Sequence, residues 1–178
     1  MYITNIHERK ISAASKEVGA LLDTVSSTED RMWPYENWSN IKFDRPLEVG
    51  AIGGHGPIRY TVTSYTPGKS IRFIFTKDFD GYHELVLIEL DATRCLLRHP
   101  IQANTTGFMF LMWFMMIRPL HNALVEDLFD KVEIQVSCNP RPRSWGLWVK
   151  LLRRLRRLPT HNKHLNSELG KKAPRPVK

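Results

Sequence analysis

The chain has 178 residues, of which 42% are hydrophobic and 25% charged, a composition that is ordinary for one globular domain with its own core. Positive charge is concentrated at one end: residues 1–137 carry 14 Lys and Arg against 17 Asp and Glu, whereas residues 138–178 carry 12 against 1. The body therefore has a net charge of −3 and the tail one of +11. Since a nucleic-acid-binding domain needs positive charge on its folded surface, we do not expect this body to bind nucleic acid.

The first ten residues, MYITNIHERK, are polar where an export signal needs an apolar core, so no such signal is expected. Cys95 and Cys138 form neither a CxxC nor a zinc pattern, and we expect reduced thiols in a cytoplasmic protein. The seven histidines are scattered along the sequence, without HExxH or another metal-ligand spacing. We therefore expect neither a metal nor a cofactor.

The first third of the chain predicts two strands, a helix and a loop. Residues 2–11 predict a strand, and a helix capped by Ser12 or Ser15 follows to about Val25. Residues 30–46 are rich in Trp, Pro and Asn, which predicts a loop or a broken helix with aromatic anchors. Residues 47–54 then predict a strand that ends in the turn GGHGP, with His55 exposed. That turn lacks the GxxxxGK[ST] pattern of a phosphate-binding loop.

Alternation of apolar and polar residues fixes the faces of the next two strands. The turn TPGK, residues 66–69, has Pro and Gly at its centre, which suits a type II turn. Pairing Thr66 with Lys69 places six apolar side chains on one face, namely Ile58, Tyr60, Val62, Ile71, Phe73 and Phe75. The opposite face carries Arg and Thr, as in an antiparallel sheet with one covered face.

The register of the following hairpin depends on the loop near residues 78–81. A loop there with an even number of residues continues the apolar face through Tyr82, Glu84, Val86 and Ile88. If the next turn, at Asp91 and Ala92, is a two-residue loop, Glu84 lies opposite His99 on the inner face. A three-residue loop or a bulge would turn His83 inward instead. After the turn at Asp91 and Ala92, the inner face continues with Cys95, Leu97, His99 and Ile101.

Helical spacing runs from Gly107 to about Val136, and its first part is GFMFLMWFMMI, eleven consecutive residues without a charge. Eleven residues make a helix about 16 Å long, against about 30 Å for a bilayer core, so we do not expect a membrane span. The run is then either an ordinary core helix or the wall of a pocket, and its four methionines favour the pocket. Pro119 is expected to kink the helix or to divide it into an apolar and an amphipathic part.

Several phrases within residues 1–137 resemble one family. The predicted order is a strand, a helix, antiparallel strands and a long C-terminal helix. This order, together with five sequence segments, resembles a bacterial branch of the START-like SRPBCC superfamily of polyketide cyclase/dehydrase and lipid-transfer proteins. The segments are WPYENW, VGAIGGHGPIRY, YTPGKSIRF, GYHELVLIEL and IRPLHNALVEDLFDKVE. The resemblance implies an α+β helix-grip fold, in which a curved antiparallel sheet wraps around the long helix and an apolar cavity. The cavity residues that it implies are Tyr60, Val62, Phe73, Phe75, Val86, Leu97, Met109, Met112, Trp113 and Met116.

Glu84 and His99 are the main candidates for acid–base chemistry, because a carboxylate beside an imidazole in an apolar pocket can move protons. Some relatives carry out aldol cyclisation or dehydration. His83 is the reserve candidate, and His121 is either a polar group of the cavity or a histidine on the helix surface. A purely structural ion pair or hydrogen bond explains the same residues without catalysis.

The tail contains WGLWVKLLRRLRRL, residues 145–158, which predicts a basic amphipathic helix. Trp145, Trp148 and leucines share one side of the helical wheel, and a basic side opposes them, formed by Lys150, Arg153, Arg154 and Arg157. This arrangement is typical of a helix in a membrane interface, where each Lys or Arg near anionic lipid gains about 1 kcal/mol. The alternatives are docking on the domain, a partner protein, or nucleic acid. We expect disorder over residues 160–178.

We therefore predict a helix-grip domain over residues 1–137 and a basic tail over 138–178. The expected function is binding, and carrying, a hydrophobic small molecule or lipid. The tail would hold this cytoplasmic protein at the inner face of the membrane. The alternatives are a cyclase/dehydratase-like enzyme and an interaction protein whose pocket is filled by its own side chains.

Overall fold

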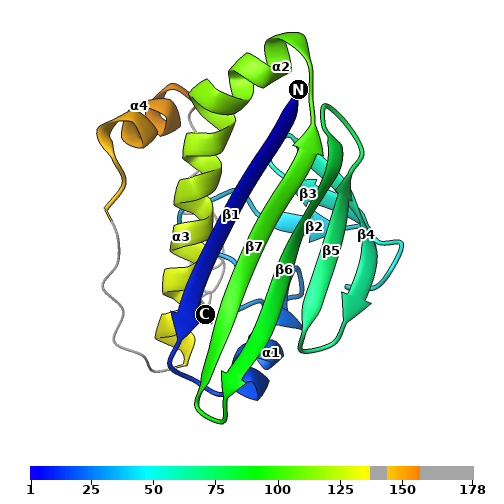
Figure 1. Ribbon diagram of the computed structural model, residues 1–178, viewed down its shortest axis with the longest axis vertical. Coiled ribbons are helices and arrows are strands. Elements are labelled where there is room, and N and C mark those ends of the chain that lie inside the picture. Colours follow the sequence, from blue (N-terminus) through cyan, green and yellow to red (C-terminus); the bar gives the residue numbers. More distant parts are fainter. Residues whose placement is uncertain (137–143, 157–178) are drawn as a thin grey trace, which may run out of the picture.

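The computed structural model describes residues 1–136 and 144–156. Within this part, a seven-stranded antiparallel sheet lies against one long helix, with strand order β1-β7-β6-β5-β4-β3-β2 (Figure 1). The strands are β1 (Tyr2–Ile11), β2 (Ile41–Phe43), β3 (Ile52–His55), β4 (Ile58–Thr66), β5 (Ser70–Phe75), β6 (Asp80–Asp91) and β7 (Arg94–Asn104). The helices are α1 (Ser15–Leu22), α2 (Gly107–Met112), the π-helix η1 (Trp113–Ile117), α3 (Arg118–Gln135) and α4 (Leu147–Arg156). The predicted α+β helix-grip fold is confirmed.

Helix α1 closes one end of the sheet, and its cap differs from the prediction. Ala14 precedes the helix and supplies no side-chain cap. The hydroxyl of Ser15 instead donates to Glu89 Oε2 at 2.7 Å, which ties α1 to β6. Gly19 packs directly on the TPGK turn, because a Cβ there would lie 2.5 Å from the carbonyl oxygen of Gly68. The close approach of helix and turn therefore requires glycine at position 19.

The loop after α1 carries the expected aromatic anchors, since Trp33 and Trp38 are both buried. It also contains the short strand β2, which alternation did not reveal. The strand expected from residue 47 begins only at Ile52. Gly50 has φ +92°, a left-handed conformation that interrupts an extended chain.

Strands β4 and β5 have the predicted faces. Tyr60 pairs with Phe75 and Val62 with Phe73, and Tyr60, Val62 and Phe73 are all buried. A bulge between Val62 and Ser64 shifts the pairing near the turn by one residue, so that Thr66 faces Ser70 rather than Lys69.

Strand β6 has the opposite orientation from the preferred prediction. His83 pairs with Ile101, and His83, Leu85 and Leu87 point inward. The ladder between β6 and β7 shifts between Glu89 and Asp91, and such a bulge turns every preceding side chain to the other face. The preferred register was therefore wrong and the bulged alternative is confirmed. Strand β7 faces as expected, with Cys95, Leu97, His99 and Ile101 buried.

The long helix is continuous from Gly107 to Gln135, and it changes from α to π geometry just before Pro119. These 29 residues are long and apolar enough to cross a membrane by length and composition, with a mean hydropathy of 1.3 over the most apolar window. The length limit therefore applies to the eleven-residue run and not to the whole helix, and the expectation of no membrane span stays a prediction. Its C-terminal half nevertheless packs on the sheet, with Leu120, Leu124, Leu128 and Val132 buried.

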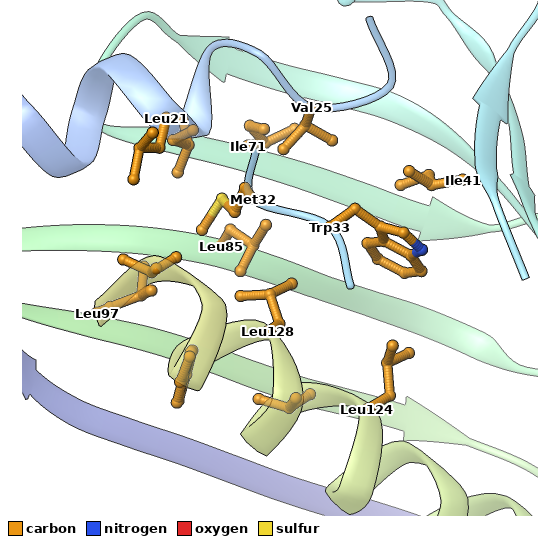
Figure 2. Packing of buried hydrophobic residues seen from close by; sticks show 14 of the residues in the cluster. Leu21, Val25, Met32, Trp33, Ile41, Ile71, Leu85, Leu97, Leu124 and Leu128 are labelled. Carbon is orange, nitrogen blue, oxygen red and sulfur yellow. The ribbon is translucent and has the colours of Figure 1, made fainter. Parts of the chain in front are cut away.

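The core lies between the concave face of the sheet and α3. Figure 2 shows Leu124 and Leu128 of α3 pointing toward side chains of the strands, of α1 and of the loop after α1. The labelled partners are Leu21, Val25, Met32, Trp33, Ile41, Ile71, Leu85 and Leu97. The helix is therefore held on one side by the sheet and on another by the Trp-rich loop.

Strand β1 meets α3 through polar groups rather than apolar ones. The guanidinium of Arg9 donates to Glu126 at 2.6 Å, to Glu133 at 2.9 Å and also to Asp130. Its side chain is only 13% exposed. His7 lies 3.1 Å from a Glu126 oxygen. These contacts fix the position of the helix along the edge of the sheet.

Candidate ligand-binding site

A cavity of about 320 Å³ lies between the sheet and the long helix. Six of the residues implied by the resemblance line it, namely Tyr60, Phe73, Phe75, Met109, Met112 and Trp113. The Trp-rich loop contributes Trp33 and Trp38, which the sequence did not assign to it. Most of the remaining wall is aliphatic or aromatic, including Ile3, Val25, Ile41, Ile58, Phe79, Leu85, Ile101, Ile117, Leu120, Leu124, Val125 and Leu128.

Four implied cavity residues lie elsewhere. Val62 and Leu97 are fully buried in the core, where neighbouring side chains separate them from the cavity. Val86 is on the outer face of the sheet, because of the β6 register. Met116 packs against the core without lining the cavity.

The methionine-rich helix forms one end of the cavity, and it is not buried on every side. Phe108, Met109 and Met112 line the cavity. Its outer side is open: the side chain of Phe108 is 71% exposed, that of Leu111 55% and that of Met115 50%. The run is thus both a cavity wall and an exposed apolar surface.

Four histidines that are far apart in the sequence meet at the cavity: His55, His83, His99 and His121. His83 stacks on Phe73, with ring centroids 4.8 Å apart, and meets the edge of Tyr60 at the same distance. His83 and His99 are 5.4 Å apart, and His99 and His121 5.1 Å. His55 was expected to be exposed, but it is half-buried beside Trp33, because it ends strand β3 instead of lying in a turn.

The predicted pairing of Glu84 with His99 is absent. The carboxylate of Glu84 forms an ion pair with Arg72 on the outer face of the sheet. Only its backbone carbonyl reaches His99, accepting a hydrogen bond from Nδ1. Glu84 therefore cannot serve as an acid or base in the cavity, whereas the reserve candidate His83 is inside it.

Burial keeps these histidines neutral. It lowers the pKa of His55 and that of His99 to about 4, and it lowers the pKa of His83 and of His121 well below the usual range. An imidazolium in this apolar setting would lose its hydration without gaining a carboxylate. At neutral pH the cavity thus offers uncharged imidazoles.

Among the described residues, five buried side-chain polar atoms have no hydrogen-bond partner. Three of them, Tyr60 Oη, His83 Nε2 and His121 Nδ1, belong to residues that line the cavity, whereas Arg98 and Arg153 do not line it. Across residues 1–136 and 144–156, no group of three or more His, Cys, Asp or Glu side chains is arranged to hold a metal ion. The unpartnered atoms are therefore available to polar groups of a small molecule.

The tail helix α4 docks on the domain, one of the alternatives that the sequence left open. Trp145 Nε1 donates to Asp127 Oδ1 at 3.0 Å, and the neighbouring Trp38 Nε1 donates to Asp127 Oδ2 at 2.8 Å. Arg153 was expected on a solvent-facing basic side, but its guanidinium lies 4.0 Å from the ring centroid of Trp145. Leu152 is buried.

Trp148 links α4 to the methionine-rich helix. Its Nε1 donates to the carbonyl oxygen of Met115 at 2.9 Å. Pro119, four residues after Met115, has no N–H with which to bond that carbonyl in the α-helical manner. Lys150 and Arg154 are exposed as expected, while Arg157 and the segment 160–178 lie outside the described residues.

Solved structures of the same fold come from plants and bacteria. Norcoclaurine synthase from Thalictrum flavum is 8% identical, with a TM-score of 0.61, over 76% of this chain and 87% of that one. CalU16 from Micromonospora echinospora is 15% identical, with a TM-score of 0.53, over 86% and 83%. A conserved protein of unknown function from Enterococcus faecalis is 17% identical, with a TM-score of 0.56, over 89% and 87%. No family model and no curated protein matches the chain.

The sheet, the long helix and these likenesses define the chain as a helix-grip protein. The fold is the helix-grip fold that the resemblance implied. Assignment to a bacterial branch of the START-like superfamily stays a prediction.

Proposed function

We propose that this protein binds a hydrophobic small molecule in the cavity between the sheet and the long helix. The observation that carries the proposal is a cavity of about 320 Å³ whose wall is mostly apolar but includes a few convergent polar groups, the usual composition of a small-molecule site. A norcoclaurine synthase of the same fold has been solved with dopamine and hydroxybenzaldehyde, so this fold can hold small aromatic molecules.

Replacing Leu85 by Trp tests the cavity, since Leu85 lines it and a larger side chain would fill it. We expect wild-type protein to bind N-phenyl-1-naphthylamine saturably, with increased fluorescence, and Leu85→Trp to weaken binding by at least about tenfold, a loss of about 1.4 kcal/mol. The matched control is Val86→Trp, one residue along β6 but on its outer face. Equal loss in both variants, or no saturable binding by wild-type protein, would contradict the proposal.

A second part of the proposal concerns an anionic membrane surface. Two sets of large apolar side chains are exposed, and the hydrogen bond from Trp148 to the Met115 carbonyl joins them. The set on α2 and η1 is Phe108, Leu111, Phe114 and Met115, and the set on α4 is Leu147, Trp148, Leu151 and Leu155. Figure 1 shows α4 beside the N-terminal half of the long helix. Arg118, at the start of α3, and Lys150 and Arg154 of α4 are also exposed. We name these two sets the apolar–basic surface.

The charge of this region favours anionic lipid as the occupant. The sequence has no Asp or Glu over residues 92–125 or 134–167. Large exposed apolar side chains next to basic ones are typical of interfacial helices. Because Phe108 belongs to both the cavity wall and the apolar–basic surface, docking would bring one end of the cavity to the lipid. A hydrophobic ligand could then pass between bilayer and cavity with little exposure to water.

Leu151→Asp tests this surface, because it places a negative charge among exposed apolar residues of α4. We expect wild-type protein to cosediment with phosphatidylglycerol vesicles but not with phosphatidylcholine vesicles, and both added salt and Leu151→Asp to reduce binding at least about tenfold. Ile74→Asp is the control, since Ile74 is equally exposed, at 45%, but lies on β5. Binding that survives Leu151→Asp and removal of residues 141–178 would refute this part. Dimerisation through the same residues, detected by sedimentation without vesicle binding, would also refute it.

A cyclase/dehydratase-like activity would have to use the cavity histidines, because Glu84 lies outside. The observation that favours this activity is that His83, His99 and His121 lie next to one another at the cavity. If the protein binds ligands but turns over no polyketide-like substrate, the enzyme hypothesis has no support.

A further inference from the structure

The polar atoms of the cavity wall indicate what kind of hydrophobic molecule fits. Tyr60 is 0% exposed and His83 8%, yet Tyr60 Oη and His83 Nε2 have no hydrogen-bond partner, and neither has His121 Nδ1. Buried polar groups in folded proteins are almost always hydrogen-bonded, so three exceptions around one cavity call for a partner. A ligand with polar atoms at matching places would supply it.

A chain of hydrogen bonds from the Glu84 carbonyl through His99 to His121 determines which nitrogen of His121 carries its hydrogen. The carbonyl of Glu84 can only accept, so His99 Nδ1 carries the hydrogen of that bond. In a neutral imidazole the other nitrogen is an acceptor, and His99 Nε2 must therefore accept from His121 Nε2, 3.1 Å away. His121 thus carries its hydrogen on Nε2 and presents a lone pair at Nδ1. That lone pair requires a hydrogen-bond donor.

We propose that the cavity selects an apolar molecule that carries a hydroxyl group, and that this hydroxyl donates its hydrogen bond to His121 Nδ1. A second ligand oxygen would then satisfy the Tyr60 hydroxyl, next to His83. The proposal rests on ligand binding in the cavity, and it adds the chemical class of the ligand. A wholly apolar ligand would leave all three atoms unsatisfied, at a cost in affinity.

Three naphthalene probes distinguish ligand binding in the cavity from recognition of a hydroxyl group by His121. 2-Naphthol has a hydroxyl donor, 2-methoxynaphthalene has the oxygen without the hydrogen, and naphthalene has neither. With full-length protein at pH 7.5, we expect calorimetry to show 2-naphthol binding at least about tenfold more tightly than 2-methoxynaphthalene. Equal affinities would overturn the hydroxyl subsite and leave the cavity function standing. No binding of any probe would overturn both.

Two variants locate the subsite. His121→Leu removes the acceptor, so the preference for 2-naphthol should disappear, whereas the control Val86→Leu, on the outer face of β6, should keep it. Among naphthalenediols, at least one isomer should bind more tightly than 2-naphthol and lose that advantage in Tyr60→Phe. A hydroxyl preference that persists in His121→Leu, or diols without any advantage, would overturn the corresponding contact.

Nitrogen-15 NMR of the imidazoles provides a test that needs no variant. We expect the Nδ1–H tautomer for His99 and the Nε2–H tautomer for His121 in wild-type protein. Addition of 2-naphthol, but not of 2-methoxynaphthalene, should shift the His121 Nδ1 resonance. The Nδ1–H tautomer at His121 would refute the proposal, since that nitrogen would then have no lone pair to offer.

Discussion

Arg9→Met should lower the free energy of unfolding by about 3–5 kcal/mol, the usual cost of removing one partner of a buried ion pair. The guanidinium joins Glu126, Asp130 and Glu133 of α3, and its side chain is only 13% exposed. Methionine keeps much of the apolar stem but leaves three carboxylates close together without the cation that they share. Urea denaturation followed by circular dichroism measures the change.

Arg94→Met is the matched control for Arg9→Met. Arg94 forms an ion pair with Asp91 at the β6–β7 hairpin, and its side chain is 62% exposed. Exposed pairs contribute about 0–1 kcal/mol, because solvent screens them. Losses of equal size in the two variants would show that the Arg9 cluster does not hold the helix on the sheet.

Acidification from pH 7.5 to pH 5 should destabilise the protein before its carboxylates titrate. Loss of hydration lowers the pKa of half-buried His55 and that of buried His99 to about 4 in the folded state, against about 6.5 in an unfolded chain. The unfolded state therefore binds more protons between these values, and stability falls as the pH falls through this window. Each of these two histidines should cost roughly 2 kcal/mol at pH 5, and His83 and His121 act in the same direction.

His83→Phe tests the origin of this acid sensitivity. His83 stacks between Phe73 and Phe75, with interplanar angles of 24° to each, so that a phenyl ring has suitable neighbours. The variant should lose part of the stability difference between pH 7.5 and pH 5, measured as urea midpoints at both values. An unchanged difference, or equal stability of wild-type protein at the two pH values, would contradict burial as the cause.

Strand β6 shows how much of the site could be predicted from the sequence. Alternation over GYHELVLIEL allows two faces, and the sequence offered Leu85 and Leu87 beside His83 on the one that proved to be buried. The sequence could not decide between them, because neither the odd length of the loop before the strand, which pairs Ile74 with Tyr82, nor the bulge between Glu89 and Asp91 can be read from the pattern. His121 had a clearer signal, because Leu124, Val125 and Leu128 follow at helical spacing and all are buried.

The tail helix shows the limit of a helical wheel. The wheel separates tryptophans from arginines, but the docked side combines Trp145, Leu152 and Arg153. Asp127 decides this arrangement by accepting hydrogen bonds from two indoles, and the guanidinium of Arg153 lies over both rings. Trp38 comes from the Trp-rich loop and Asp127 from α3, so the pattern within the tail could not predict these contacts.

By itself the sequence determined the long strands and the helices and the inner faces of β4, β5 and β7, because periodicity and turn residues act over short distances. Its resemblance to a known family implied the helix-grip fold, whereas β2 was not predicted. The tertiary structure decided the β6 register, the docking of α4, and the meeting of four histidines from β3, β6, β7 and α3 at one cavity. Those features depend on bulges and on contacts between segments far apart in the chain. The residues next to these positions in the sequence therefore do not predict them.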